Sequence, residues 1–186
     1  ENREIFYLSV NRLVPNKRID LLIQSFNKLN LPLYIVGDGP EYKKLKNISN
    51  INIKLLGKQP DHIVENLMGK CRAFVYSGIE DFGIAPVEAM ASGAPIIALS
   101  KGGILDTVSC ITKSTDKVYP TGVLFNNQSI NDIVDTVSWF EEKNVWKNFD
   151  PEILNNLSHK FSEENFSKKF LNFINKAIEE FALKKY

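Results

Sequence analysis

The sequence predicts an α/β fold, with a Rossmann-like parallel sheet of about six strands and helices on both faces. Apolar runs alternate along the chain with segments in which apolar residues recur at helical spacing. These runs also show little alternation between polar and apolar residues, which is typical of parallel strands covered on both faces. The expected strands are residues 5–10, 33–36, 51–57, 73–76, 95–99 and 121–125. In such a sheet, ligands bind in the loops that follow the strands.

The composition argues against several classes of protein. The chain has 186 residues, 44% of them hydrophobic and 24% charged, which is typical of one soluble globular domain. Its net charge of +1 gives no reason to expect nucleic acid as a partner. The two cysteines and two histidines lack the spacing of a zinc site or a disulfide framework. Without a membrane-length apolar run or a signal-peptide pattern, a cytoplasmic location is expected.

The first expected strand leads into a loop that carries three cations. Arg12, Lys17 and Arg18 lie between this strand and a helix over residues 19–29. A cationic loop between the end of a strand and the start of a helix favours a phosphate site, because arginine and lysine are the usual partners of phosphate. The same residue types also fit ordinary solvated surface charges.

The second and third expected strands end in less specific loops. The second leads into Gly37-Asp38-Gly39, with a helix expected from residue 41. A Gly-x-Gly pair without a third glycine is a weak nucleotide signal, and a tight turn explains it better. The third strand leads through Lys58 to a helix over residues 61–68, for which Asp61 is the expected N-cap.

The stretch after the fourth expected strand is the least like a generic soluble domain. It places Glu80 and Glu88 eight positions apart. Pro86 suits the first position of a helix, so the helix is expected to begin near Ala85 or Pro86, with Glu88 in its first turn. Gly93 is expected to end the helix in a left-handed conformation.

Both carboxylates are therefore expected beside a helix N-terminus, where free N–H groups favour an anion. This arrangement favours a site for a phosphorylated ligand. In a simpler interpretation, Glu88 complements the helix dipole while Glu80 and Asp81 are solvated. Gly83, which permits close approach of the backbone, and Phe82, an aromatic residue in a loop, favour the binding site.

The remaining loops and the C-terminus complete the pattern. After the fifth expected strand, Gly102 and Gly103 free backbone N–H groups, either for a phosphate contact or for a turn alone. Ser129 is expected to cap a helix that reaches Phe140. Residues 162–186 predict a long amphipathic helix. It is expected to pack on its own protein, although such a helix also fits an anionic membrane surface.

The motif around the two glutamates resembles the Glu-x7-Glu signature of retaining glycosyltransferases of the GT-B fold (glycosyl transferases group 1, or family 4 type). The residues in register are Glu80, Phe82, Gly83, Pro86, Glu88, Ala89, Gly93 and Pro95. The resemblance covers nearly all of the chain, but only the C-terminal, donor-binding half of such an enzyme. It implies that Glu80 is catalytic and faces the donor sugar, and that Glu88 hydrogen-bonds the ribose hydroxyls.

The resemblance extends to the other loops. Arg12, Leu13 and Lys17 match an Arg-Leu-x3-Lys run whose cations clasp the donor diphosphate, whereas Arg18 departs from the glycine more common at its position. The nucleotide base is expected near Gly57 and Lys58. The donor-binding residues implied by the resemblance are Arg12, Lys17, Gly37, Gly39, Lys58, Phe82, Gly83, Ile84, Glu88, Gly102 and Gly103.

Within the family, the chain looks most similar to bacterial mannosyltransferases. This implies transfer of a mannosyl group from GDP-mannose to a glycan or glycolipid in surface polysaccharide synthesis, at the inner face of the cell membrane. A UDP-sugar donor and a non-catalytic nucleotide-binding module are the alternatives. Because the sequence has no Asp-x-Asp motif and no histidine cluster, we expect a reaction without a metal or other cofactor.

The resemblance also predicts how the chain is divided. We expect residues 1–160 to form the nucleotide-sugar-binding domain, and the helix in 161–186 to pack on it and toward a missing N-terminal domain. Without that domain, the chain is expected to be an inactive half. An NAD-linked domain would need Gly-x-Gly-x2-Gly after the first strand, and the loop there has no such run.

Overall fold

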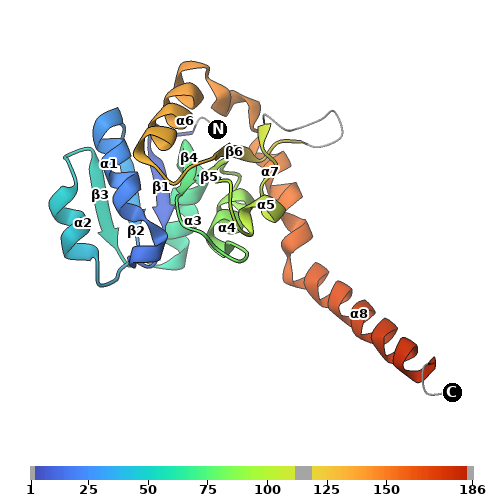
Figure 1. Cartoon of the computed structure of the whole chain (residues 1–186). Helices are drawn as coiled ribbons and strands as arrows, with labels where there is room; N and C mark the ends of the chain where they lie inside the picture. Colours follow the sequence, from blue (N-terminus) through green and yellow to red (C-terminus); the bar gives the residue numbers. More distant parts are fainter. Residues whose placement is uncertain (1–2, 112–118, 184–186) are drawn as a thin grey trace.

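The computed structural model describes residues 3–111 and 119–183. Their centre is a six-stranded parallel sheet with the order β3-β2-β1-β4-β5-β6 (Figure 1). The strands are β1 (Tyr7–Val10), β2 (Leu33–Val36), β3 (Ile53–Gly57), β4 (Ala73–Tyr76), β5 (Ile96–Leu99) and β6 (Gly122–Phe125). The predicted fold class is confirmed, because each expected strand is present, two with the predicted bounds and four beginning one or two residues later.

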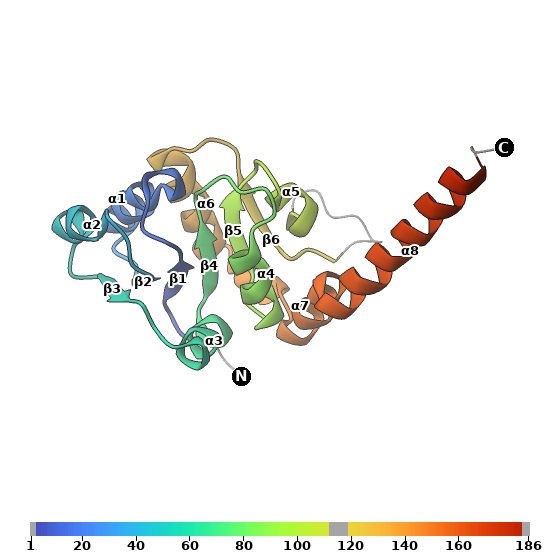
Figure 2. The same cartoon turned by 90° about the horizontal axis from the view of Figure 1, so that it is seen from below.

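Helices cover both faces of this sheet. The α-helices are α1 (Ile19–Leu29), α2 (Tyr42–Ile48), α3 (Asp61–Lys70), α4 (Ile84–Ala91), α5 (Ile104–Thr107), α6 (Ile130–Glu142), α7 (Pro151–Ser158) and α8 (Glu163–Leu183). Helix α1 packs against α6, whereas α4 packs against both α3 and α7, and Figure 2 shows the two groups on opposite faces. Strands β4 and β5 are buried along their whole length, which explains their continuous apolar runs.

The starts of α6 and α3 test the two predicted N-caps. Ser129 caps α6 as predicted, since its hydroxyl accepts a hydrogen bond from the Asp132 amide at 3.1 Å. Asp61 is not the N-cap of α3. The carbonyl of Pro60 accepts the first helical bond, from the Val64 amide, so Asp61 is the first helical residue and its charge complements the helix dipole.

Helix α4 begins earlier than predicted. Gly83 adopts a φ of 85° and is the N-cap, so the helix starts at Ile84 and Pro86 occupies its third position. The left-handed glycine turns the chain into the helix before the proline is reached. Glu88 therefore lies in the second turn rather than the first. The predicted left-handed glycine at the other end is confirmed, because Gly93 has a φ of 81°.

A buried polar cluster lies at the start of the strands, at the opposite edge of the sheet from the predicted loops. The Tyr7 hydroxyl donates to the Glu141 carboxylate at 2.7 Å, and the Arg72 guanidinium approaches the same carboxylate oxygen at 3.2 Å. The guanidinium also stacks 4.2 Å from the Trp146 ring centre. This cluster joins β1, β4 and α6.

Tyr7 is expected to make the protein sensitive to alkali. Burial and the hydrogen bond to Glu141 raise its pKa above the ordinary 10.0. Above about pH 10 the unfolded chain loses the phenolic proton while the folded chain keeps it, so the free energy of unfolding falls as pH rises. Urea unfolding from pH 8 to 11.5 should show a shallower decline for Tyr7→Phe. Equal slopes for the wild type and Tyr7→Phe would contradict this assignment.

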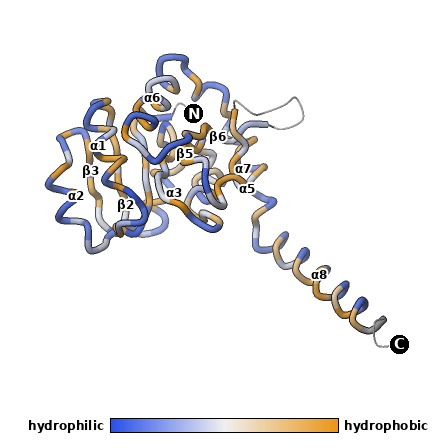
Figure 3. The backbone as a smooth tube through the Cα atoms, viewed as in Figure 1, coloured by the Kyte–Doolittle hydropathy of each residue, from blue (hydrophilic) through white to orange (hydrophobic). Residues whose placement is uncertain are grey.

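The C-terminal helix α8 projects away from the domain in Figure 1 and packs against the short 3-10 helix η4 (His159–Phe161). Its apolar stripe is visible along the helix in Figure 3. The exposed residues are Phe166, Phe170, Leu171, Phe173, Ile174, Ile178 and Phe181. The described residues of α8 thus leave most of this stripe exposed. That the helix packs toward another domain stays a prediction. In the described part of the chain, no helix has both the length and the apolarity needed to cross a membrane.

Candidate functional site

Loops from four strands meet at the carboxyl edge of the sheet, as the parallel topology requires. A cavity of ≈ 660 Å³ is lined there by Val10, Asn11, Arg12, Val36, Gly37, Asp38, Lys58, Gln59, Asp61, Val64 and Glu88. A second cavity of ≈ 260 Å³ is lined by Val10, Asn11, Arg12, Lys17, Tyr76, Glu80, Gly83, Ile84, Ala85 and Pro86. Arg12 lines both, so the two cavities adjoin. We call the first the nucleotide cavity and the second the Glu80 cavity.

The cationic loop after β1 presents two of its three cations to these cavities. Arg12 is exposed, and Lys17 ends the 3-10 helix η1 (Pro15–Lys17) with its ammonium paired to the Glu80 carboxylate. Partial burial lowers the pKa of Lys17. Arg18 differs, because its side chain pairs with Asp20 at 3.1 Å and lines neither cavity. Its φ of 52° is left-handed, a conformation that glycine adopts most readily and that fits the glycine of the resembled family.

The end of β4 holds the cationic loop in place. The Ser77 hydroxyl donates to the backbone carbonyls of Lys17 at 3.0 Å and Arg18 at 2.9 Å. In turn, the Gln128 side chain donates to the Ser77 carbonyl at 2.8 Å. Buried Ser77 thus connects Lys17, about 60 residues before it, to Gln128, about 50 residues after it.

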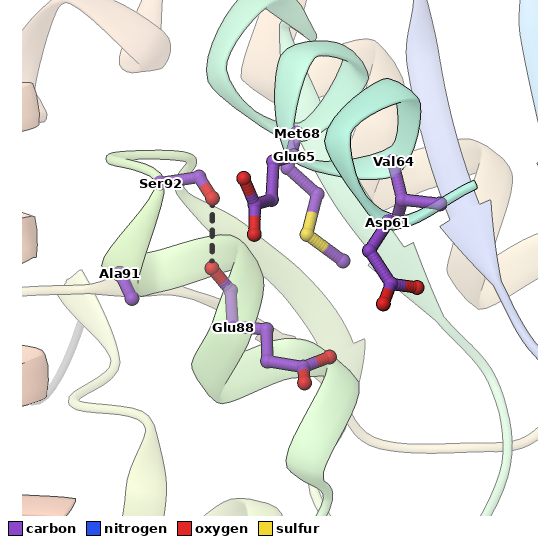
Figure 4. A pocket seen from close by; sticks show the side chains of 7 residues that line it. All are labelled: Asp61, Val64, Glu65, Met68, Glu88, Ala91 and Ser92. Atoms are coloured by element: carbon purple, nitrogen blue, oxygen red, sulfur yellow. Dashed lines mark hydrogen bonds between the residues drawn. The ribbon is translucent and has the colours of Figure 1, made fainter. Parts of the chain in front are cut away.

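Glu88 reaches the nucleotide cavity from α4. It also borders a third cavity of ≈ 400 Å³ between α3 and α4, which Asp61, Glu65 and Ser92 help to line. Figure 4 shows the carboxylates of Glu88 and Asp61 extending to the same side of the two helices, with Glu65 nearer to Ser92. Ser92 donates to the backbone carbonyl of Glu88 at 3.0 Å, which leaves the Glu88 carboxylate available for a ligand. Among the described residues no acidic or histidine group forms a metal-binding cluster.

The first pair of predicted glycines lets two loops approach each other. A Cβ on Gly37 would lie 2.9 Å from the carbonyl carbon of Asn11, and one on Gly39 would lie 2.8 Å from that of Leu13. Both distances are too short for real side chains, so the loop after β2 closes tightly on the loop after β1. Gly37 lines the nucleotide cavity, whereas Gly39 lines none of the cavities described above.

The second pair of glycines supports the Glu80 loop. The Gly103 amide donates to the Glu80 carbonyl at 2.7 Å, and a Cβ on Gly103 would lie 2.6 Å from Cα of Phe82. A Cβ on Gly102 would lie 3.4 Å from the Glu80 carbonyl carbon and closer to its oxygen. These glycines line none of the three cavities, and they act on the site by allowing their turn to pack against the loop that carries Glu80.

Phe82 takes part in packing, whereas Ile84 lines the Glu80 cavity. The Phe82 ring is 42% exposed and meets Phe161 edge-on at 5.5 Å, so it joins the Glu80 loop to η4 instead of lining the Glu80 cavity. Ile84 is 68% exposed and lines that cavity together with Gly83.

Three uncharged polar residues that line the nucleotide cavity or the Glu80 cavity were missed by sequence reasoning. Asn11 and Gln59 bring amides to the nucleotide cavity, and Tyr76 brings a hydroxyl to the Glu80 cavity. Asn11 and Gln59 lie directly beside Arg12 and Lys58, so their position next to predicted site residues was an available signal. Tyr76 lies in a buried strand, and no signal in the sequence pointed to its place in the site.

The arrangement suits a ligand with several chemical parts. Arg12 supplies positive charge to both cavities and Lys17 supplies it to the Glu80 cavity, and Glu88 supplies a hydrogen-bond acceptor on one side of Arg12. Glu80 lies on the other side. A phosphorylated compound with hydroxyl groups on both sides of its phosphates would match this order of groups.

Three comparisons with known proteins show what the chain is similar to. Glycosyl transferases group 1 is the family that matches, over residues 1–167. An uncharacterized glycosyltransferase of Methanocaldococcus jannaschii is 36% identical over 120 residues, covering 58% of this chain and 34% of the relative. An alpha-1,3/1,6-mannosyltransferase of Kluyveromyces lactis is 26% identical over 222 residues, covering 96% of this chain and 44% of the relative.

A solved structure shares the fold. A point mutant of S. aureus TarM, in complex with Fondaparinux, alpha-GlcNAc-glycerol and UDP, superposes with a TM-score of 0.76 at 24% identity. The match covers 94% of this chain and 36% of TarM. The chain thus spans less than half the length of each of these proteins.

Proposed function

Because the chain belongs to the glycosyl transferases group 1 family, we propose that it binds the nucleotide-sugar donor of a glycosyltransferase along the carboxyl edge of its sheet. One observation carries the proposal. Arg12 joins two cavities, one bordered by Glu88 and the other by Glu80 and Lys17. A nucleotide-sugar has its diphosphate between a ribose and a sugar, and this order matches the order of the residues.

In this proposal each part of the donor has its own partner. Arg12 and Lys17 bind the diphosphate through charge-assisted hydrogen bonds. Glu88 accepts hydrogen bonds from the two ribose hydroxyls. Glu80 faces the sugar as the catalytic residue, and the base lies near Lys58.

The departing diphosphate gains negative charge as the sugar leaves, and this charge must be stabilised. Arg12, Lys17 and the N-terminus of α4 supply positive charge beside the Glu80 cavity, which supports a reaction without a metal ion. Retention of configuration at the sugar is proposed from the resemblance of the Glu-x7-Glu motif.

We propose GDP-mannose as the donor and a glycan or glycolipid as the acceptor. The similarity to a mannosyltransferase of K. lactis supports mannose, whereas the UDP in the TarM complex favours a UDP-sugar as the second candidate. Each relative is more than twice as long as its matched part, which supports an acceptor site outside these residues. On this proposal the chain alone binds the donor and transfers little sugar.

Thermal unfolding with GDP, UDP and NAD tests donor binding. A nucleotide at 100 times its dissociation constant adds about 2.7 kcal/mol, which raises the melting temperature by about 5–11 °C for a chain of this size. We expect this shift for GDP, with a smaller one for UDP and none for NAD. A larger shift with UDP would replace GDP-mannose by a UDP-sugar. Stabilisation by NAD, or by none of the three, would contradict the proposed donor site.

A further inference from the structure

Tyr76, at the end of β4, is a buried tyrosine whose hydroxyl faces the Glu80 cavity. Its side chain is 2% exposed, and its hydroxyl donates a hydrogen bond to Oε1 of Glu80. A buried tyrosine hydroxyl needs a hydrogen-bond partner, and here the partner is the carboxylate of the proposed catalytic residue. Tyr76 therefore does more than fill the core.

Lys17 contacts the same oxygen of Glu80. The two donors differ in what else they can bind. Lys17 has three N–H donors on a flexible chain and carries a full charge, so a diphosphate in the adjoining cavity attracts it. Tyr76 has a single O–H on a rigid ring held within the strand.

The backbone around these residues favours movement of the Lys17 side chain alone. The Ser77 hydroxyl fixes the Lys17 carbonyl at 3.0 Å, and the Gly103 amide fixes the Glu80 carbonyl at 2.7 Å. Both loops are thus held at the backbone, so the Lys17 ammonium can leave Glu80 by rotation of its side chain without movement of its loop.

We propose that Tyr76 is a positioning residue that holds Glu80 toward the donor sugar while Lys17 turns from Glu80 to the diphosphate. This inference rests on the proposed function. Burial raises the pKa of Tyr76 to about 12, so the hydroxyl keeps its proton and remains a donor throughout the neutral range. Tyr76 itself touches neither the diphosphate nor the nucleoside in this proposal.

The test compares two ligands that differ only by the sugar. Dissociation constants for GDP and GDP-mannose, and for UDP and UDP-glucose, are measured by calorimetry on the 186-residue chain and on Tyr76→Phe. The wild type is expected to bind the nucleotide-sugar of its own donor more tightly than the nucleotide. Tyr76→Phe should bind the nucleotide within about twofold of wild type but lose about three- to tenfold in its preference for the nucleotide-sugar, the scale of one hydrogen bond.

Two further variants sharpen the comparison. Glu80→Gln should lose the same preference, because it changes the group that Tyr76 holds. Tyr34→Phe is the matched control, since its hydroxyl contacts Lys54 at 3.1 Å and it lines none of the three cavities. This control should bind both ligands as the wild type does, and melting temperatures measured in parallel confirm that each variant is folded.

Each other outcome has a distinct meaning. Tyr76→Phe with an unchanged preference, or with equal losses for nucleotide and nucleotide-sugar, would overturn the positioning role while leaving the proposed function standing. A wild-type chain that binds both ligands equally would show that Glu80 does not face the sugar. This result would also overturn the positioning role of Tyr76. A chain that binds no nucleotide would refute the proposed function, and the inference with it.

Discussion

Glu88→Ala is expected to weaken the binding of GDP by about 10- to 150-fold. A hydrogen bond to a charged group contributes about 1.5–3 kcal/mol, and a tenfold change in affinity corresponds to about 1.4 kcal/mol. The Glu88 carboxylate borders the nucleotide cavity and has no side-chain partner among the described residues. In the proposed site it is therefore free to accept hydrogen bonds from the ribose. Calorimetric titration of the chain with GDP measures the loss.

A nucleotide without its 2′-hydroxyl identifies the group that Glu88 binds. Wild type should bind 2′-deoxy-GDP more weakly than GDP, whereas Glu88→Ala should bind the two alike, because the partner of the hydroxyl has been removed. Glu65→Ala is the matched control, since Glu65 shares the cavity between α3 and α4 but does not line the nucleotide cavity. A Glu65→Ala loss equal to that of Glu88→Ala would indicate a general electrostatic effect instead of a ribose contact.

Arg12→Ala separates the phosphate site from the ribose site. It should weaken GDP binding by a similar factor but keep the discrimination between GDP and 2′-deoxy-GDP, because in the proposed site Arg12 faces the diphosphate. Its loss should also shrink as salt is added, since a charge contact with a phosphate is screened. Unchanged affinity in both Glu88→Ala and Arg12→Ala would refute the donor site.

The fold could be predicted because its signals are local. Buried parallel strands such as β4 and β5 appear as unbroken apolar runs, and α1 and α6 repeat their apolar residues at helical spacing. The parallel order then brings the loops after the strands to one edge, so Arg12, Lys17 and Glu80 could be expected together from sequence alone.

Features that depend on the partners of a residue could not be predicted. The apolar stripe of α8 shows that a partner surface is needed but not which one, and in the structure the helix projects from the domain. Tyr76 looks like any core aromatic residue until its hydroxyl is seen on Glu80. The early start of α4 depends on the left-handed conformation of Gly83. The sequence-based prediction used Pro86 to place the start and so put it too late.

The roles of the glycines were also hard to predict from the sequence. Glycines after strands were consistent with a backbone contact to phosphate or with a turn alone. The structure places Gly39 against Leu13, and Gly102 and Gly103 against the Glu80 loop. Each glycine serves the close approach of one loop to another, a property of two segments that neither segment reveals by itself.

Gly37→Ala is expected to cause the largest loss of stability, about 3–5 kcal/mol. Its φ of 129° is unfavourable for any residue with a Cβ, and the new Cβ would lie 2.9 Å from the Asn11 carbonyl carbon and closer to its oxygen. Strained backbone and overpacking each cost about 1–3 kcal/mol. The melting temperature should fall by about 6–20 °C, as measured by circular dichroism.

Gly57→Ala measures backbone strain without overpacking. Gly57 has a φ of 66°, but a Cβ there would meet nothing within 4 Å, so only the backbone strain of about 1–2 kcal/mol applies. Gly37→Ala is expected to lose more for two reasons: its φ of 129° lies outside the left-handed region that residues with a Cβ can adopt, and its Cβ forces apart the loops after β1 and β2. Because Asn11 and Gly37 both line the nucleotide cavity, Gly37→Ala should also weaken GDP binding at temperatures where it is still folded. Equal destabilisation by both substitutions would mean that the two loops are free to separate, and the nucleotide cavity would then not be the rigid site that donor binding requires.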